Sequence, residues 1–477
     1  MIEGYLPKQD RKNILLLCDD IRMHSGIATM AREFVIGTSH RYNWFNLGAA
    51  VDHPDKGKII DISADVNKHA LITDSDVKVM PNTGYGDAVI LRELLKTFKF
   101  DAIFIFTDPR YWVWLFEIER EIRSKVPIFW LNIWDDYPAP MYNRDYYDSV
   151  DVLMSISKQT KNINELVLQE KVQGKLIEYV PHGINENTFF PIGKEHYLAA
   201  DLLKFKESTL PVESEFTVFY NSRNIHRKRT ADHILAFKIF CDKLTPDQAK
   251  KCSLIMHTET VSQHGTDLKS VKDAIYPDGN IFFSSSKINP NQMNMLYNIA
   301  DVTMLLSSNE GWGLSLTESM MAGTMIIGNV TGGMQDQMRF VDEKGEWINF
   351  SADFPSNHRG TYKECGEWAI PVFPSNISLA GSPSTPYIFD DRCNPEDAAE
   401  ALYKAYSLTK EERIEKGLKG REWVTSEESQ MSASNMNKNI IRCIDKGFDN
   451  YKPRTKFDIV KIDNFKPIQI PHKLYGY

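Results

Sequence analysis

The sequence lacks the apolar stretch that a membrane-spanning helix requires, because none of its runs approaches about eighteen consecutive apolar residues. Its first seven residues, MIEGYLP, contain an acid and a proline where a signal peptide would have an apolar segment. Cysteine is scarce, and the 6 cysteines form no C-x-x-C pair, so neither a disulfide framework nor a zinc site is indicated. We therefore expect a cytoplasmic protein without membrane insertion.

An excess of basic residues is also missing, since 56 Lys and Arg face 64 Asp and Glu, for a net charge of −8. This balance disfavours a protein that coats nucleic acid, although a local basic face stays possible. The 26 Gly and 22 Pro are too few for a collagen-like or low-complexity chain. The length of 477 residues suits two large domains better than one core.

Short apolar runs alternate with segments of helical periodicity, the pattern of parallel sheets covered by helices. A helix is expected from about 27 to 36. Buried strands are expected at 14–18, 102–106, 128–133 and 150–155, and, after a polar connection around 192–215, at 216–220, 253–256, 280–283, 302–306 and 325–328. We predict an α/β protein with two doubly wound Rossmann-like domains, 1–191 and 192–428, followed by a helix near 430–443 and a basic tail within 429–477.

An insertion at 341–388 interrupts this rhythm, with few helix or strand signals. It contains seven aromatic residues, and we therefore expect it to be ordered.

The most informative stretch is 307–336, which follows one of the expected strands. Glu310 falls at the carboxyl end of that strand, where open parallel sheets bind ligands. Gly311 and Gly313 leave room for close approach, and Glu318 falls in the first turns of an expected helix whose N-terminus suits a phosphate. Two such carboxylates can each accept hydroxyls from a different sugar, as a nucleotide-sugar requires. The alternative is that Glu318 is a helix acid and Glu310 a loop charge.

A basic cluster follows the strand expected at 216–220. Arg223 and Lys228 lie five residues apart across a loop-to-helix turn, so both can reach one diphosphate through charge-assisted hydrogen bonds. The alternative is a solvated basic patch. In a helical segment Arg227 and Arg229 would point differently from Lys228, and we expect them to be solvated.

Taken in order, Arg223…Lys228, Glu310-x7-Glu318 and Gly332-Gly333 resemble the donor site of retaining GT-B glycosyltransferases with the E-x7-E signature. Further blocks resemble segments of the same family. Residues 179–185, with Phe189 and Pro191, resemble its interdomain segment, and residues 295–301 resemble the helix and strand start before the first Glu. Trp423 resembles the Trp that precedes the last helix. The sequence of residues 329–337 is similar to that of phage-encoded members of this family. Paired glycines alone would simply indicate a turn.

The resemblance implies the GT-B fold, with two domains facing across a cleft and a C-terminal helix that crosses back to the first domain. It implies that Arg223 and Lys228 hold the donor diphosphate, that Glu310 binds hydroxyls of the transferred sugar, and that Glu318 binds the ribose. Further substrate-binding positions are Gly26, Gly311, Trp312, Gly313 and Leu314. Asp135 falls where relatives have a catalytic-site His, and its alternative is a turn or helix-capping residue. Asp108, at the carboxyl end of a strand, is a candidate for the acceptor site.

The expected activity is transfer of a hexosyl or pentosyl group from a nucleotide-sugar, a UDP-sugar, to an acceptor hydroxyl with retention. Because two basic residues can neutralise the departing phosphate and no D-x-D pair is suitably placed, we expect neither a metal nor another cofactor.

The expected acceptor is a hydroxymethylated base in double-stranded phage DNA, within the host cytoplasm. The basic tail would touch phosphates and bases through Lys452, Arg454, Lys456, Phe457, Lys461, Phe465, Lys466 and Lys473. The alternative for this tail is a solvated C-terminal arm that packs on the first domain. The net charge favours a polysaccharide or small acceptor instead, and that alternative stays open. So do a non-catalytic nucleotide-sugar-binding protein, a phosphorylase and an epimerase.

Overall fold

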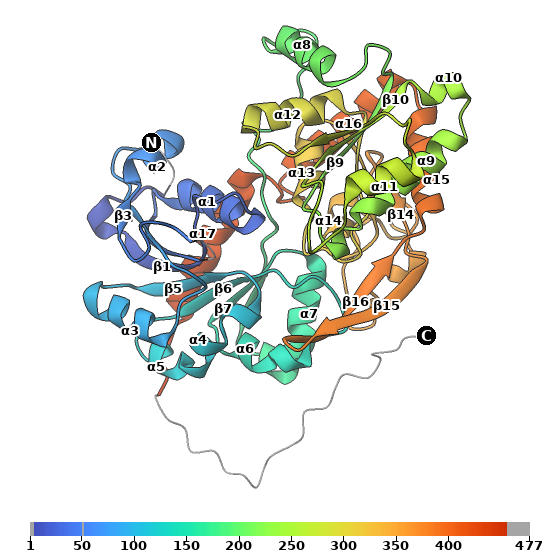
Figure 1. The fold of residues 1–477 in the computed structure, drawn as a ribbon. Coiled ribbons are helices and arrows are strands. Elements are labelled where there is room, and N and C mark those ends of the chain that lie inside the picture. The colour runs from blue at the N-terminus through green and yellow to red at the C-terminus, as the bar shows by residue number, and fades with distance from the viewer. Residues whose placement is uncertain (1–3, 50–51, 456–477) are drawn as a thin grey trace. The chain divides into compact units, whose positions relative to one another are not determined.

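The computed structural model describes residues 4–49 and 52–455. The chain divides into two compact units (Figure 1). Unit 1 contains the chain up to residue 134, 138–183 and the chain from 433 on, whereas unit 2 contains 135–137 and 184–432. The predicted boundaries, 191/192 and 428/429, lie a few residues from these positions.

Unit 1 is built on an eight-stranded sheet with the order β3-β4-β2-β1-β5-β6-β7-β8. Its strands are β1 (Lys12–Asp19), β2 (Tyr42–Ala49), β3 (Ile60–Asp61), β4 (Val77–Pro81), β5 (Ala102–Phe106), β6 (Ile128–Asn132), β7 (Val152–Ser155) and β8 (Leu176–Tyr179). All neighbours pair in parallel except β3 and β4. The apolar runs of β5 and β6 are fully buried and occupy the middle of the sheet, as parallel strands covered on both faces require.

The α-helices of unit 1 are α1 (Gly26–Thr38), α2 (Ser63–Ala70), α3 (Ala88–Thr97), α4 (Val113–Glu117), α5 (Glu119–Arg123), α6 (Arg144–Asp148), α7 (Lys158–Leu168) and α17 (Ala433–Asn450). Short 3-10 turns are η1 (Lys8–Asp10), η2 (Pro109–Tyr111), η3 (Met141–Asn143) and η4 (Gln169–Val172). The expected helix at 27–36 corresponds to α1.

The C-terminal helix α17 belongs to unit 1, where it packs against α1 and β7. Tyr42 donates a hydrogen bond of 2.7 Å to Asp445, and Phe448 contacts Phe129 edge-on. Gly447 allows this approach, because a Cβ there would lie 2.5 Å from the Phe129 ring. The predicted return of the last helix to the first domain is therefore confirmed.

Unit 2 contains a six-stranded parallel sheet with the order β11-β10-β9-β12-β13-β14 and a two-stranded antiparallel hairpin, β15-β16. The strands are β9 (Phe216–Asn221), β10 (Cys252–His257), β11 (Ile281–Ser284), β12 (Val302–Leu305), β13 (Met325–Asn329), β14 (Ala369–Val372), β15 (Asn376–Ser382) and β16 (Thr385–Arg392). The insertion predicted at 341–388 thus contains β14, β15 and the start of β16.

The α-helices of unit 2 are α8 (Ala199–Thr209), α9 (Thr230–Asp242), α10 (Pro246–Ala249), α11 (Leu268–Ile275), α12 (Pro290–Ile299), α13 (Leu314–Met321), α14 (Met334–Met338), α15 (Pro395–Ser407) and α16 (Lys410–Thr425). Its 3-10 turns are η5 (His226–Lys228) and η6 (His358–Gly360). Trp423 lies near the end of α16, directly before α17, as predicted.

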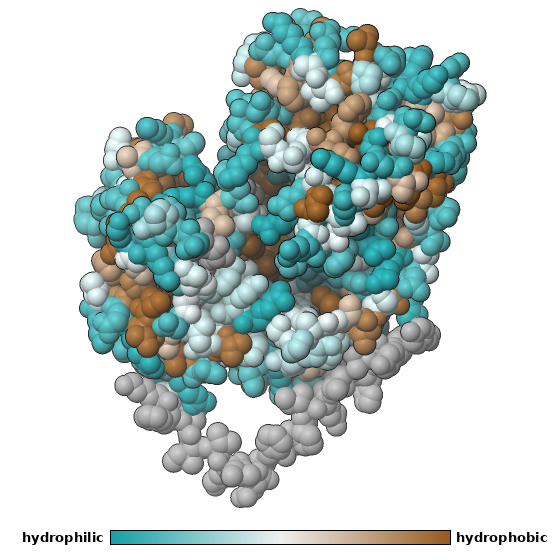
Figure 2. All heavy atoms as spheres, viewed as in Figure 1, coloured by the Kyte–Doolittle hydropathy of each residue, from teal (hydrophilic) through white to brown (hydrophobic). Residues whose placement is uncertain are grey.

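Neither unit offers a membrane-crossing element: within the described part of the chain, each helix is too short or too polar to span a bilayer. On the face shown in Figure 2, hydrophilic residues cover most of the surface and apolar residues are scattered among them. Single exposed apolar side chains such as Leu71 and Val212 are ordinary on a globular protein.

Candidate functional site

The strand order of unit 2 contains one reversal that positions its loops. From β9 the chain proceeds outward through β10 and β11, returns to β12 beside β9, and proceeds outward again through β13. The loops that leave the carboxyl ends of β9 and β12 therefore diverge in opposite directions and leave a crevice, the usual ligand position in open α/β sheets. Arg223 and Lys228 follow β9, and Glu310 follows β12.

At this position Glu310 forms a buried ionic cluster with two cations. Its carboxylate accepts hydrogen bonds from the Lys228 ammonium and, at 2.5 Å, from Arg227 Nη1. The Arg227 Nη1 also donates to the backbone oxygen of Asn309, at 2.9 Å. Glu310 is 6% exposed and Lys228 8%.

Charge and burial act in opposite directions on this cluster. Burial alone would raise the pKa of Glu310, but Lys228 and Arg227 hold it below its usual value. Burial lowers the pKa of Lys228 to about 8, against the opposing effect of Glu310 and with a further lowering by Arg227. Glu310 is therefore an ionised acceptor at neutral pH, in a setting that excludes most water.

The expectation that Arg227 points away from Lys228 is wrong, although its side chain is 37% exposed. The residues 226–228 form a single 3-10 turn, which ends at Arg229 in a left-handed conformation with φ of 52° before α9 begins. An α-helical projection does not apply to this turn, and Arg227 and Lys228 both reach Glu310. Arg229 does point elsewhere, since it pairs with Asp232 at 2.8 Å.

Arg223 is exposed at the start of the same loop. Among the described residues, its side chain engages no hydrogen bond or ion pair, while its backbone oxygen accepts from the Ile225 N–H at 3.1 Å. The structure thus places Arg223 on the loop of Lys228 without joining it to Glu310, and its role on a diphosphate stays a prediction.

Glu318 lies on α13, and its carboxylate contacts two polar groups from other elements. Tyr297 of α12 donates a hydrogen bond of 2.5 Å to Glu318 Oε2, and Asn221 Nδ2 lies 3.4 Å from the same oxygen. Burial raises the pKa of Glu318 to about 7, although both hydrogen bonds act to lower it. The carboxyl group of Glu318, which lies on α13 and follows Glu310 in the sequence, is therefore about half protonated near neutral pH.

Sequence reasoning did not identify Tyr297 and Asn221 as partners of Glu318. Tyr297 falls inside the block 295–301, which precedes Glu310 and Glu318 in the sequence. Asn221 is the last residue of β9 and precedes Arg223 and Lys228. A polar side chain at the carboxyl end of a strand was the available signal for Asn221.

Glycines bring two loops of this site into backbone contact. A Cβ on Gly332 would lie 1.9 Å from the backbone oxygen of Glu310, and one on Gly333 would lie 2.2 Å from that of Gly311. The Gly333 N–H donates to the Glu310 oxygen at 3.0 Å. Gly332 and Gly333 therefore let their loop pack against the loop of Glu310 and Gly311. This contact fixes the backbone of Glu310.

The residues between the two glutamates differ in their surroundings. Gly313 adopts a left-handed φ of 89° directly before α13, which begins at Leu314. The Trp312 side chain is buried, and its indole donates to Thr317 at 2.9 Å. The side chain of Trp312 is thus engaged within the unit, whereas Leu314 is half-buried at the start of the helix.

Asp135 belongs to unit 2, although the segment 135–137 lies between two strands of unit 1 in the sequence. Its Oδ2 lies 3.8 Å from Arg227 Nη1, which adds a second carboxylate to the cluster. The segment is also bound by a 2.7 Å hydrogen bond from the Phe389 N–H to the Tyr137 oxygen.

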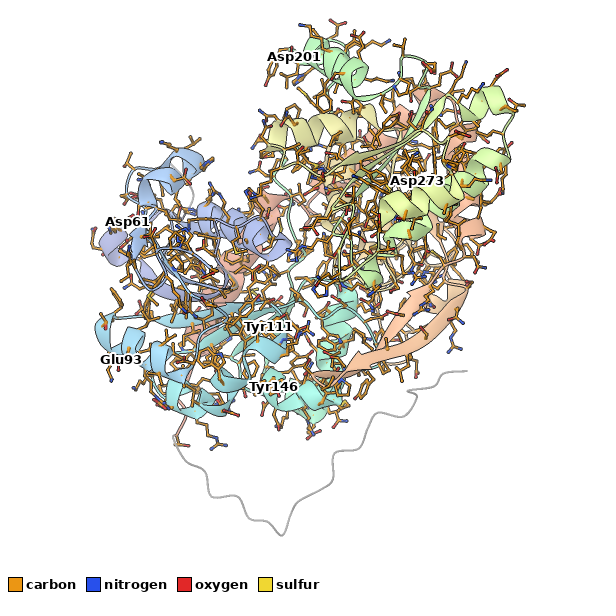
Figure 3. The ribbon with its side chains drawn as sticks, viewed as in Figure 1. Asp61, Glu93, Tyr111, Tyr146, Asp201 and Asp273 are labelled. Atoms are coloured by element: carbon orange, nitrogen blue, oxygen red, sulfur yellow. The ribbon has the colours of Figure 1, made fainter. Side chains whose placement is uncertain are left out.

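Unit 1 has a similar reversal between β1 and β5, and the predicted residues Gly26 and Asp108 follow these strands. Gly26 is the first residue of α1, behind the capping residue Ser25. Asp108 caps η2 and pairs with Arg110 at 3.2 Å. Tyr111, labelled in Figure 3, lies in the same turn. Both predicted residues thus occupy the carboxyl edge of the unit 1 sheet.

Residues 203–350 match the family described as Glycosyl transferases group 1, and this segment contains Arg223, Lys228, Glu310 and Glu318. No curated protein matches the chain in sequence.

Solved structures are similar over most of the chain. HepE of Anabaena, solved in complex with UDP and glucose, has a TM-score of 0.61 at 12% identity, with 91% of this chain and 100% of that chain covered. Sucrose-phosphate synthase of Thermosynechococcus elongatus has 0.62 at 14%, covering 92% and 100%. A glycosyltransferase of Rickettsia africae has 0.61 at 14%, also covering 92% and 100%. The chain therefore has the two-domain α/β GT-B fold that the sequence predicted, and its second unit contains a segment that matches Glycosyl transferases group 1.

Proposed function

We propose that the protein is a retaining glycosyltransferase that moves a sugar from a UDP-sugar to an acceptor hydroxyl. The observation that carries the proposal is the buried Glu310, held by Lys228 and Arg227 at the reversal point of the unit 2 sheet. This cluster lies within the segment that matches Glycosyl transferases group 1, and two of the similar structures are a glycosyltransferase and a protein solved with UDP and glucose.

Each residue has a role that its chemistry suits. Glu310 is ionised and accepts hydrogen bonds from hydroxyls of the transferred sugar. Lys228 donates to both carboxylate oxygens of Glu310 and retains one further N–H donor, and with Arg223 it binds the diphosphate. Glu318 accepts hydroxyls of the ribose. Asp135, close to Arg227, contacts the donor sugar or the acceptor.

The transfer step needs positioning and charge stabilisation and no protein nucleophile. The bond between the anomeric carbon and the β-phosphate oxygen breaks, and a bond from that carbon to the acceptor oxygen forms on the same face. The acceptor proton passes to the departing phosphate oxygen, and UDP leaves. Lys228 and Arg223 stabilise the charge that develops on the phosphate, so we propose that no metal takes part.

The proposed acceptor is a hydroxymethylated base in double-stranded DNA. This part rests on the similarity of 329–337 to phage-encoded members and on the basic C-terminal segment. Lys452 and Arg454 of that segment are described, whereas Lys456, Phe457, Lys461, Phe465, Lys466 and Lys473 lie outside the described residues. The net charge of −8 favours a second candidate, a polysaccharide or a small hydroxylated acceptor.

The test is incubation with a panel of nucleotide-sugars, with and without hydroxymethylated DNA, while released nucleotide is measured. We expect UDP release to rise with DNA and nucleosides of increased mass to appear in the digested product, with the anomeric configuration of the donor retained. Glu310→Gln should lower the rate about a hundredfold or more. Lys238→Ala, which removes a half-buried lysine of α9 that pairs with Asp242, is the control. Binding of UDP-sugars without release under any condition would contradict an enzymatic function.

A further inference from the structure

A large basic pocket lies in unit 1, and its lining includes none of the residues assigned above to donor binding or to transfer. It has a volume of about 910 Å³. The basic residues that line it are Arg120, Arg123, Lys175, Lys452 and Arg454, and the acidic ones are Asp151 and Asp449. The pocket therefore has an excess of positive charge within a chain whose net charge is negative.

The pocket is at the amino edge of the unit 1 sheet. Its lining includes Asp151, which directly precedes β7, and Lys175, which directly precedes β8. Gly26 and Asp108 follow strands of the same sheet and lie at its carboxyl edge. Strands of four or five residues at about 3.3 Å each separate the two edges by about 15 Å.

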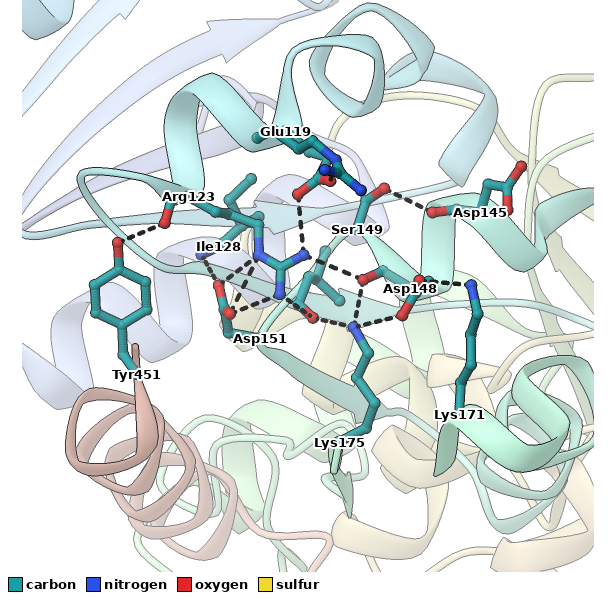
Figure 4. A network of polar contacts seen from close by, with 12 residues as sticks. Glu119, Arg123, Ile128, Asp145, Asp148, Ser149, Asp151, Lys171, Lys175 and Tyr451 are labelled. Carbon is teal, nitrogen blue, oxygen red and sulfur yellow. Dashed lines mark hydrogen bonds and ion pairs between the residues drawn. The ribbon is translucent and has the colours of Figure 1, made fainter. Parts of the chain in front are cut away.

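Arg123 lines the pocket and is at the centre of the network of polar contacts in Figure 4. Its guanidinium donates to Asp151 at 2.7 Å and to Glu119 at 3.0 Å. Its backbone oxygen accepts from the Tyr451 hydroxyl at 2.8 Å and from the Arg454 N–H at 2.9 Å. Arg123 thus has its charge compensated, and it holds the segment 451–454 against the pocket.

Lys175 is a buried cation of the lining whose acidic partner is Asp148. Its Nζ donates to the backbone oxygens of Asp148 and Val150 and lies 3.4 Å from the Asp148 carboxylate. Burial lowers the pKa of Lys175 to about 8, Arg123 lowers it further, and Asp148 only partly opposes both. An anion in the pocket would reverse this effect.

Lys452 and Arg454 are positioned to meet such an anion. Within residues 4–49 and 52–455, no hydrogen bond or ion pair engages either side chain, and Lys452 is exposed. The sequence continues with Lys456, Lys461, Lys466 and Lys473. A series of cations along one segment matches the repeated charges of a linear polyanion better than it matches a single phosphate.

We propose that this pocket, whose lining includes Lys452 and Arg454, binds the phosphodiester backbone of double-stranded DNA. The inference rests on the DNA acceptor of the proposed function and assigns it a holding surface in unit 1 that contains none of the residues of the transfer site. Contacts at the amino edge add affinity without touching the reacting atoms. Loss of these contacts therefore raises KM for DNA and leaves kcat unchanged.

The experiment compares the wild-type protein with Lys452→Glu/Arg454→Glu, using anisotropy of a labelled unmodified duplex over a series of salt concentrations and no donor sugar. We expect the double variant to bind about tenfold or more weakly, with a slope of log K against log salt that is smaller by about 2. The matched control is Lys204→Glu/Lys269→Glu, which makes the same charge change at two exposed lysines of unit 2.

Equal binding by the double variant and the control, or no binding by the wild type at low salt, would overturn the inference. UDP release from a nucleotide-sugar without DNA is measured in parallel on the same proteins. If release persists while DNA binding is absent, the inference fails and the glycosyltransferase stands. If DNA binding follows the expected pattern while release is absent, the DNA surface stands and the proposed enzymatic function fails.

Discussion

Glu310 and Lys228 form a buried ion pair although 82 residues separate them in the chain. The pairing follows from topology, because Glu310 follows the carboxyl end of β12, Lys228 follows that of β9, and these two strands are adjacent and parallel. A buried pair of this kind is costly to desolvate, and it therefore contributes little net stability, although removal of one partner is strongly destabilising.

Lys228→Ala removes one partner of that pair and leaves Glu310 with Arg227 alone. We expect the free energy of unfolding to fall by about 3 kcal/mol, because an incompletely paired carboxylate remains buried. Lys228→Met/Glu310→Gln should recover most of this loss while staying inactive. Urea unfolding of the two variants checks the prediction, and equal destabilisation of both would contradict it.

Arg227 should matter for activity although sequence reasoning assigned it to solvent. Arg227→Ala removes one of the two cations that hold Glu310 ionised, and we expect kcat/KM to fall about tenfold or more. Arg229→Ala, which removes a cation paired with Asp232, is the matched control and should keep nearly full activity. Initial rates of UDP release measure both, and an equal loss in the two variants would refute a specific role.

Glu318 predicts a pH dependence of stability. Because its pKa is raised to about 7 in the folded protein, folding favours its protonated form. The stabilisation from this site is fully present below about pH 4.5 and is lost as pH rises through 7. Glu318→Gln removes this dependence, so its melting temperature relative to wild type should be higher at pH 8 than at pH 5. The difference corresponds to a free energy on the order of 2 kcal/mol.

An unchanged difference between pH 5 and pH 8 would show that Glu318 titrates normally. The same group should also affect donor binding, because only the carboxylate accepts two ribose hydroxyls. UDP affinity should therefore weaken as pH falls below 7, and Glu318→Gln should not show this trend.

Gly332→Ala tests the contact between the two loops of the site. Gly332 has a left-handed φ of 52°, and its Cβ would overlap the Glu310 backbone oxygen. Gly345→Ala is the control, since Gly345 has a φ of 80° with nothing within 4 Å of its Cβ. Both variants incur backbone strain of about 1 kcal/mol, and Gly332→Ala should be several kcal/mol worse and inactive. Equal melting temperatures would contradict the packing argument.

Metal independence gives a further expected outcome. Because Lys228 and Arg223 are proposed to neutralise the diphosphate, activity should be unchanged after treatment with EDTA. Activity that is lost with EDTA and restored by Mn²⁺ would refute this part of the mechanism.

Much of the fold was predictable because apolar runs mark buried parallel strands. β2 was missed because Asn43 and Asn46 interrupt its pattern, and both are buried. The Asn46 side chain is accommodated by a 3.1 Å hydrogen bond from the Ile21 N–H. Such a compensation depends on a neighbouring loop and has no local signal.

The candidate site was predictable where residues follow strand ends, as Lys228 and Glu310 do. The direction of Arg227 was not, because it depends on a 3-10 turn that ends in the left-handed Arg229. The contact between Tyr297 and Glu318 was also missed, because it depends on the packing of α12 beside α13, which the spacing of neither helix reveals.

The most direct test of the central claim is titration calorimetry of UDP into the wild-type protein, Lys228→Ala and the control Lys238→Ala. The account predicts saturable binding by the wild type and the control and an affinity at least about tenfold lower for Lys228→Ala. Absence of binding to the wild type, or equal affinity in all three proteins, would contradict it.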